Sequence, residues 1–160
     1  MADIPSIEVL ATPIQIIMEA SRILPDLQSS LFCEDVRQEA NGNFIIIGVI
    51  GIIRVPKLPI GAAKLCVFNR WTAGVGEFVE STRLLAPDQK TVLKKGEVKF
   101  NLPNASHHAT NLTVFQQVQF EQPGNYSIEV MVDEVPQIRY SIPIIVVEQP
   151  SQAQAGPDQG

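Results

Sequence analysis

From Ser30 onward the chain consists of short apolar runs separated by Gly, Pro and Asn. Runs of this length that are rich in β-branched and aromatic residues, with turn residues between them, are typical of β-strands. No helical pattern of about 10–15 residues separates them, which disfavours parallel βαβ units. The pattern therefore predicts an all-β fold of about eight strands, an antiparallel two-sheet sandwich of the immunoglobulin-like or jelly-roll-like kind. The expected strands are 30–39, 43–54, 63–71, 76–85, 97–102, 110–120, 125–133 and 137–147.

The run at 43–54 is the most apolar part of the chain. It follows Asn41-Gly42, a strong two-residue hairpin signal. A nearly continuous apolar run favours a central strand that is covered on both faces, since an exposed one would promote aggregation. Gly48 and Gly51 inside the run indicate a bulge or a bend.

The two ends of the chain have different patterns from the middle. Thr12-Pro13 followed by apolar residues at helical spacing predicts a short helix, so residues 1–29 are expected to form a partly helical extension. Residues 30–148 then form the β-domain, and the polar, Pro- and Gly-containing tail at 149–160 is expected to be disordered. The extension packs either on its own sandwich or on a neighbouring copy, and a truncation that starts at Ser29 would test this.

The net charge of −5 resides at these two ends. Residues 1–30 carry −3 and residues 148–160 carry −2, so the body of the chain is neutral. A neutral body lacks the clustered basic surface that nucleic-acid binding requires. The only dense basic spot, around Lys94-Lys95, is interpreted as the solvated end of a hairpin.

No targeting signal is apparent in the sequence. An acidic residue follows the N-terminus, and the longest apolar run has ten residues, whereas a membrane-spanning helix needs about 20. We therefore expect a cytoplasmic protein without a membrane partner. In that compartment Cys33 and Cys66 are expected to be free thiols in strands.

Asp35 and Arg37 lie in a polar stretch of the first strand (CEDVRQE, residues 33–39). Residues two apart on a strand share a face, so this acid and base can form an ion pair side by side. One interpretation is a binding site for a polar ligand, with Arg37 as a bidentate donor. The alternative is a structural pair that fixes the strand register.

Arg70 and Trp71 lie at the end of another strand, before the glycine-containing loop at 73–76. These two residue types are enriched in the energetic centres of protein interfaces. Trp71 could equally fill the core of the sandwich. Arg70 and Trp71 are therefore candidate partner contacts, with the core position of Trp71 left open.

No catalytic motif occurs in the chain. HExxH, GxSxG, the P-loop and GxGxxG are all absent, and the adjacent residues His107 and His108 point in opposite directions in an extended segment. We expect no catalytic residue, no metal site and no cofactor, and we interpret the two histidines as loop residues.

Several segments together resemble a family of small bacterial proteins of unknown function. They are the C-[DE]-D-V-R-x-E strand at 33–39, the stretch FNRWTAGVGEFVESTRLLAPD and the PGxYxIEV strand at 123–130. The resemblance covers about residues 31–147 and implies a compact β-sandwich, with no activity, substrate or cofactor. It aligns Cys33, Asp35, Arg37, Arg70 and Tyr126 with family positions and gives none of them a role.

Two functions remain open from the sequence. The first is a non-catalytic interaction module that binds a protein or self-associates, through an edge strand or the Trp71 end. The second is a β-sandwich that binds a small molecule or a metal ion through polar residues near Asp35, Arg37, Arg70 and the histidines. A flat apolar surface would favour the first, and an enclosed cavity with convergent polar groups the second.

Overall fold

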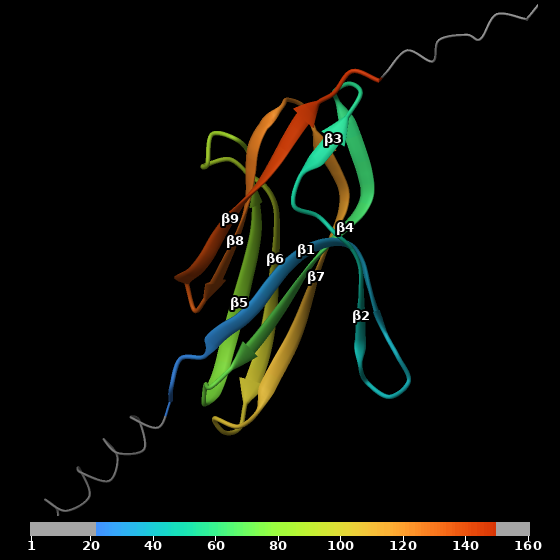
Figure 1. Ribbon diagram of the computed structural model, residues 1–160. Helices are drawn as coiled ribbons and strands as arrows, with labels where there is room; N and C mark the ends of the chain where they lie inside the picture. Colours follow the sequence, from blue (N-terminus) through green and yellow to red (C-terminus); the bar gives the residue numbers. More distant parts are fainter. Residues whose placement is uncertain (1–21, 150–160) are drawn as a thin grey trace, which may run out of the picture.

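The computed structural model describes residues 22–149, which form nine strands and no helix (Figure 1). The expected helix and the C-terminal tail fall almost wholly outside the described residues, so their conformation stays a prediction. The strands are β1 (Asp26–Gln38), β2 (Phe44–Val49), β3 (Ile53–Val55), β4 (Ile60–Thr72), β5 (Gly76–Leu85), β6 (Val92–Leu102), β7 (His108–Phe120), β8 (Gly124–Val132) and β9 (Val135–Val146).

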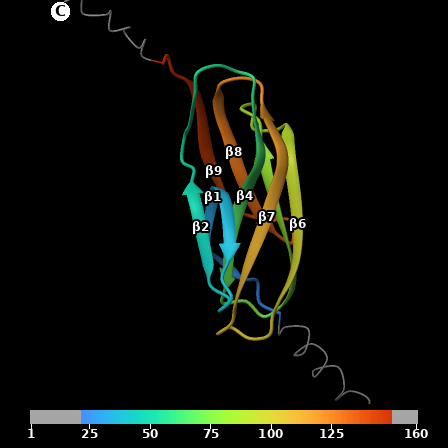
Figure 2. The same cartoon turned by 90° about the vertical axis from the view of Figure 1, so that its right-hand side faces the viewer.

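The strands form two sheets. One has the order β2-β1-β4-β7 and the other the order β3-β9-β8-β5-β6. In Figure 2 the four-stranded sheet faces the viewer, with β9 and β8 behind it. The pairs are antiparallel except that β3 runs parallel to β9, with Ile53 opposite Ile144. This parallel pair corrects the expectation of a purely antiparallel fold.

A single hydrophobic core lies between the two sheets. Alternate residues of β8 point into it, as the sequence pattern predicts, and they are fully buried because each strand turns one face inward. The rings of Phe120 and Tyr126, from different sheets, meet edge to face with centroids 5.0 Å apart. The all-β, two-sheet prediction is confirmed, whereas the choice between the immunoglobulin-like and jelly-roll-like types stays a prediction. The buried core includes Phe32, Val67, Phe78, Leu84, Phe115, Ile128, Val130 and Ile142.

The apolar run at 43–54 is not one central strand. It divides into β2 and β3, which are edge strands of different sheets. Gly48 adopts a left-handed backbone conformation (φ 65°), which glycine tolerates better than other residues, and the chain leaves the first sheet after Val49. The prediction of a covered central strand is therefore wrong. A high apolar content alone does not show whether a strand lies in the middle of a sheet or at its edge.

The β1–β2 hairpin diverges from the rest of its sheet. β1 pairs with β4 as far as Cys33 and with β2 from Cys33 onward, so its two halves have different neighbours. In Figure 1 the chain turns sharply at the end of β1, and the hairpin that β2 completes points away from the rest of the sheet. The ring of Phe44 meets that of Phe68 on β4 edge to face, at 5.9 Å between centroids. The hairpin thus packs back onto the outer face of its own sheet.

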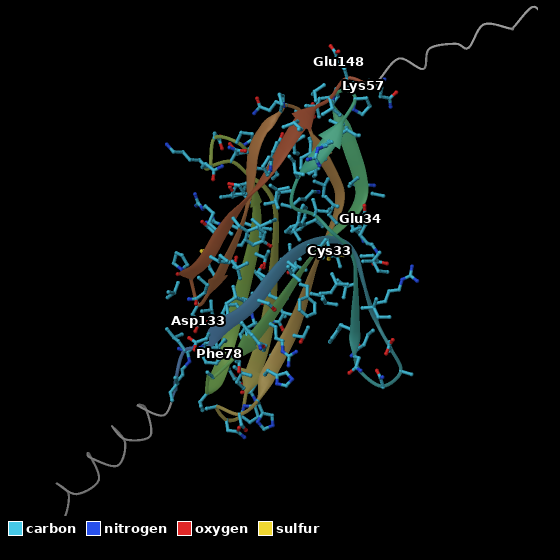
Figure 3. The ribbon with its side chains drawn as sticks, in the orientation of Figure 1. Cys33, Glu34, Lys57, Phe78, Asp133 and Glu148 are labelled. Atoms are coloured by element: carbon cyan, nitrogen blue, oxygen red, sulfur yellow. The ribbon has the colours of Figure 1, made fainter. Side chains whose placement is uncertain are left out.

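The chain is already ordered before the expected start of the first strand at residue 30. Ile23 forms a two-hydrogen-bond bridge with Val75, with both N–O distances at 2.9 Å. The guanidinium of Arg22 pairs with the Asp133 carboxylate and lies 4.8 Å from the centre of the Phe78 ring (Figure 3 labels the two partners). Residues 22–29 are therefore integral to the described fold.

Candidate functional site

Asp35 and Arg37 form the ion pair that their spacing predicts. The Nε of Arg37 lies 3.4 Å from Asp35 Oδ2, and Lys64 on β4 donates to Asp35 Oδ1 at 2.6 Å. The hydrogen bond from Lys64 holds the pKa of Asp35 below its usual value and raises the pKa of Lys64. All three groups lie at the surface, so water screens their attraction. The hydrogen bond between Lys64 and Asp35 holds the hairpin half of β1 close to β4.

A cavity of about 470 Å³ lies between the hairpin and the outer face of β4 and β7. Phe44 and Ile46 line it from the hairpin, and Arg70 and His108 line it from the sheet. The structure thus brings Arg70 and one of the two histidines together. Asp35 and Arg37 do not line this cavity.

Trp71 lies in the core, with no solvent-exposed surface. Its ring stacks on Phe100 at 5.6 Å between centroids, and its indole N–H donates to the Glu80 carboxylate. A partner cannot reach a side chain in this position. Trp71 therefore fills the core, which is one of the two positions that the sequence left open. The prediction that Trp71 contacts a partner is wrong.

Glu80 is a fully buried carboxylate and is not among the candidate residues predicted from the sequence. It accepts hydrogen bonds from Asn69 Nδ2 (2.9 Å), Asn111 Nδ2 (2.9 Å) and Thr82 Oγ1 (3.0 Å), besides the Trp71 indole. These donors come from β4, β5 and β7, so the carboxylate connects the two sheets through the core. The signal was present in the sequence, because Glu80 stands at an inward position of β5 among apolar residues.

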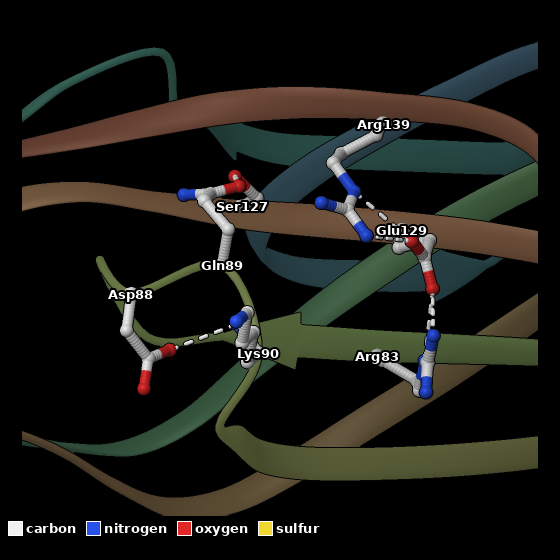
Figure 4. Close-up of polar contacts among 7 residues, drawn as sticks. All are labelled: Arg83, Asp88, Gln89, Lys90, Ser127, Glu129 and Arg139. Carbon is white, nitrogen blue, oxygen red and sulfur yellow. Dashed lines mark hydrogen bonds and ion pairs between the residues drawn. The ribbon is translucent and has the colours of Figure 1, made fainter.

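Glu129 forms a second charged cluster, on the outer face of the five-stranded sheet (Figure 4). It stands in register between Arg83 on β5 and Arg139 on β9, and each arginine donates from Nε at 3.0 and 2.9 Å. Burial raises the pKa of Glu129, but the two guanidiniums outweigh it and the net pKa is lowered. All three groups are partnered, which indicates a structural role. Cross-strand register of this kind could not be deduced from the sequence.

Cys33 and Cys66 are register partners on β1 and β4, both buried and not disulfide-linked. Cys33 lies where β1 bends (Figure 3). Burial raises the pKa of the Cys33 thiol to about 11, and the negatively charged groups nearby act in the same direction. A thiol with so high a pKa is mostly protonated near neutral pH and therefore a poor nucleophile.

β2 is an edge strand without protective residues. Its six residues contain no charge and no proline, and Ile45 and Val49 expose 43% and 58% of their surface. The other edges carry the features that normally prevent further strand pairing, or are covered. β6 carries the basic residues Lys94, Lys95 and Lys99, and β3 carries Arg54 and is followed by Pro56. Pro143 lies on the part of β9 that β3 does not pair with. β7 is covered because it packs against β6, so closely that a Cβ on Gly96 would lie 2.4 Å from Thr113.

Two further properties concern residues 22–149 alone. Within this range no three His, Cys, Asp or Glu side chains are grouped so that they could hold a metal ion. The same range contains no helix that is long and apolar enough to cross a membrane.

The model of DUF6941, a family of unknown function, matches residues 28–145. The chain belongs to this family. The match confirms the resemblance to a family of unknown function. It begins within β1 and ends within β9, so the DUF6941 region includes both sheets, the hairpin and all candidate residues named above. No curated protein matches the chain.

Proposed function

We propose that this DUF6941 protein is a non-catalytic interaction module that binds an extended segment of another polypeptide along the free edge of β2. The observation that carries the proposal is the exposed, uncharged edge of β2. An edge strand offers a row of unpaired backbone N–H and C=O groups to a further strand. The other polypeptide is a second copy of the chain or a different protein.

The side chains of β2 suit an apolar partner strand. In strand addition the backbone hydrogen bonds supply affinity, and alternate side chains supply specificity. Ile45 and Val49 would become covered, which at about 25 cal/mol per Å² of apolar surface favours the complex. The bound state would thus provide the burial that the sequence pattern of 43–54 predicts.

The test compares two lysine substitutions at equally exposed apolar residues. Ile45→Lys introduces a charge on β2, and Val135→Lys introduces the same charge at the start of β9, where the residue is also 43% exposed. The mass of the purified protein is followed against concentration, and proteins bound to each variant in the native host are identified. We expect Ile45→Lys to abolish self-association or the main partner, and Val135→Lys to retain it.

Hydrogen exchange then locates the contact. Backbone amides of β2 should exchange more slowly in the reconstituted complex than in the isolated chain. Equal association of both variants, or unchanged exchange at β2 in a complex, contradicts the proposal.

A second candidate function, the binding of a small molecule, is supported by the cavity that Arg70 and His108 line. We further propose a cytoplasmic location, which Cys33 and Cys66 support because these register partners are free thiols. Its test is the redox state of Cys33 and Cys66 in protein alkylated directly in host cells.

A further inference from the structure

The cavity beneath the hairpin is bounded by residues of three strands. Register places Arg70 beside Thr110, and Thr72 beside His108, on adjacent strands β4 and β7. Arg70, Thr110 and His108 therefore share one face of the sheet, and all three line the cavity. The bend of β1 brings Phe44 and Ile46 over this face. A volume of about 470 Å³ is within the range that small-molecule sites occupy.

Arg70 has an unusual position among the arginines. Arg22, Arg37, Arg83 and Arg139 each pair with a carboxylate, and apart from the exposed Arg54 only Arg70 takes part in no ion pair among residues 22–149. Its Nε is buried and has no hydrogen-bond acceptor in the described part of the chain. A buried donor without an acceptor costs about 1–3 kcal/mol, and more when it is charged. An acceptor that reached this guanidinium would remove that cost.

The lining provides positive charge and donors but no acid. No Asp or Glu lines the cavity among the described residues, and the Thr110 hydroxyl and the His108 ring are further polar groups. The rings of Phe44 and Phe68 form an apolar wall. A ligand that fits these groups has one anionic end and an apolar body.

The geometry points to a binding site for a small organic carboxylate with a planar, apolar body, held by Arg70. A guanidinium matches a carboxylate through two parallel hydrogen bonds. A single arginine balances one negative charge, which favours a carboxylate over a doubly charged phosphate. The apolar body would lie against Phe44 and Phe68, and Thr110 would donate to the second carboxylate oxygen. This site uses the Phe44 and Ile46 side chains on one face of β2, whereas the proposed function uses the free backbone edge of the same strand, so either proposal can fail while the other stands.

The test uses benzoate as the probe, with benzamide and inorganic phosphate for comparison. Benzamide has the shape of benzoate without its charge, and phosphate has charge without an apolar body. Nitrogen-15 NMR of the full chain follows the Arg70 Nε–H and the Thr110 amide during each titration. We expect saturable shifts with benzoate, a Kd below about 10 mM, and much smaller effects with the other two compounds.

Two variants and one control establish the role of the arginine. Arg70→Gln should raise the Kd for benzoate at least about tenfold, equivalent to about 1.4 kcal/mol. Arg54→Gln is the matched control, because Arg54 is exposed on β3 and also has no ion pair among the described residues; it should leave the Kd unchanged. Thr110→Val replaces the hydroxyl by a methyl group of similar size and serves as the second variant if Arg70→Gln does not fold, with an expected rise in Kd of about threefold or more.

Three results would overturn the proposal. One is the absence of saturable shifts with benzoate. Another is equal binding by benzamide, or tighter binding by phosphate, at the same residues. The third is unchanged benzoate affinity in folded Arg70→Gln and Thr110→Val.

Discussion

Replacing Glu80 by alanine removes the acceptor that three buried donors on the facing strands share. The Asn111 amide and the Trp71 indole would lose their acceptor, whereas the Asn69 amide would lose one of two hydrogen bonds, since it also donates to Thr82 Oγ1 at 3.1 Å. Each unsatisfied buried donor costs about 1–3 kcal/mol. Because relaxation and an entering water molecule reduce the full cost, we expect a loss of about 3–5 kcal/mol in the free energy of unfolding. That is a large part of the total stability of about 5–15 kcal/mol typical of a domain.

The variant Glu80→Gln keeps the shape of the side chain and changes its hydrogen bonds, so it separates the loss of hydrogen bonds from the loss of side-chain volume. Glutamine keeps one of the two acceptor oxygens and adds an amide donor. The Oδ1 of Asn69 is buried without a partner and can accept from that new donor after the Asn69 amide turns over. We therefore expect Glu80→Gln to cost about 1–2 kcal/mol, clearly less than the alanine variant.

Urea denaturation at pH 7, followed by tryptophan fluorescence, measures both values. Trp71 is the only tryptophan and lies against Glu80, so its emission reports the loss of the core. Glu77→Ala is the matched control: it lies on the same strand with an exposed side chain, and it should change stability by less than about 0.5 kcal/mol. A loss below about 1 kcal/mol for Glu80→Ala would refute the argument that this carboxylate holds the two sheets together.

Two other predictions concern charge and the first residues. Because the pKa of Glu129 is lowered in the folded state, its contribution to stability is present above its unfolded pKa and is lost as the pH falls through the folded pKa. Glu129→Gln should therefore flatten the decrease in stability below about pH 4.5 in acid denaturation curves, and an unchanged slope would contradict this. Deletion of residues 1–21, with Arg22 kept, should change the mass measured by light scattering if this segment covers an edge or face; an unchanged mass and melting temperature would show it to be dispensable. A truncation at Ser29 is less informative, since it also removes the start of β1 and the Arg22 contacts.

The sequence predicts the strands well wherever a strand has one buried and one exposed face. β5 has the predicted bounds, and the alternation in β8 identifies the residues that face the core, although Ser127 and Glu129 on its other face are buried as well. The prediction is wrong for 43–54, where no alternation exists to separate a covered central strand from an exposed apolar edge. Gly48 and Gly51 indicate the bend, but nothing in the sequence shows that the chain changes sheets there.

The candidate site could be predicted only in part, because it depends on contacts between distant strands. Spacing alone predicts the pair of Asp35 and Arg37, since both lie on one strand. Arg70 is identifiable by residue type, but its cavity exists only because β1 bends and the hairpin returns over β4 and β7. Trp71 shows the limit of residue type as a guide, because the same large ring suits an interface and a core.

The position of β9 has a consequence for protein synthesis. β9 is the last strand of the fold to be made, yet it lies between β3 and β8, and its partner residue for Ile53 is Ile144. The five-stranded sheet therefore cannot close until nearly all of the described chain has left the ribosome. Until then β3 (Ile53–Val55) has no strand to pair with and remains accessible to chaperones and to other nascent chains, whereas β2 can already pair with β1. We expect folding to be completed in one late step, in which β9 inserts between β8 and β3 and closes the five-stranded sheet.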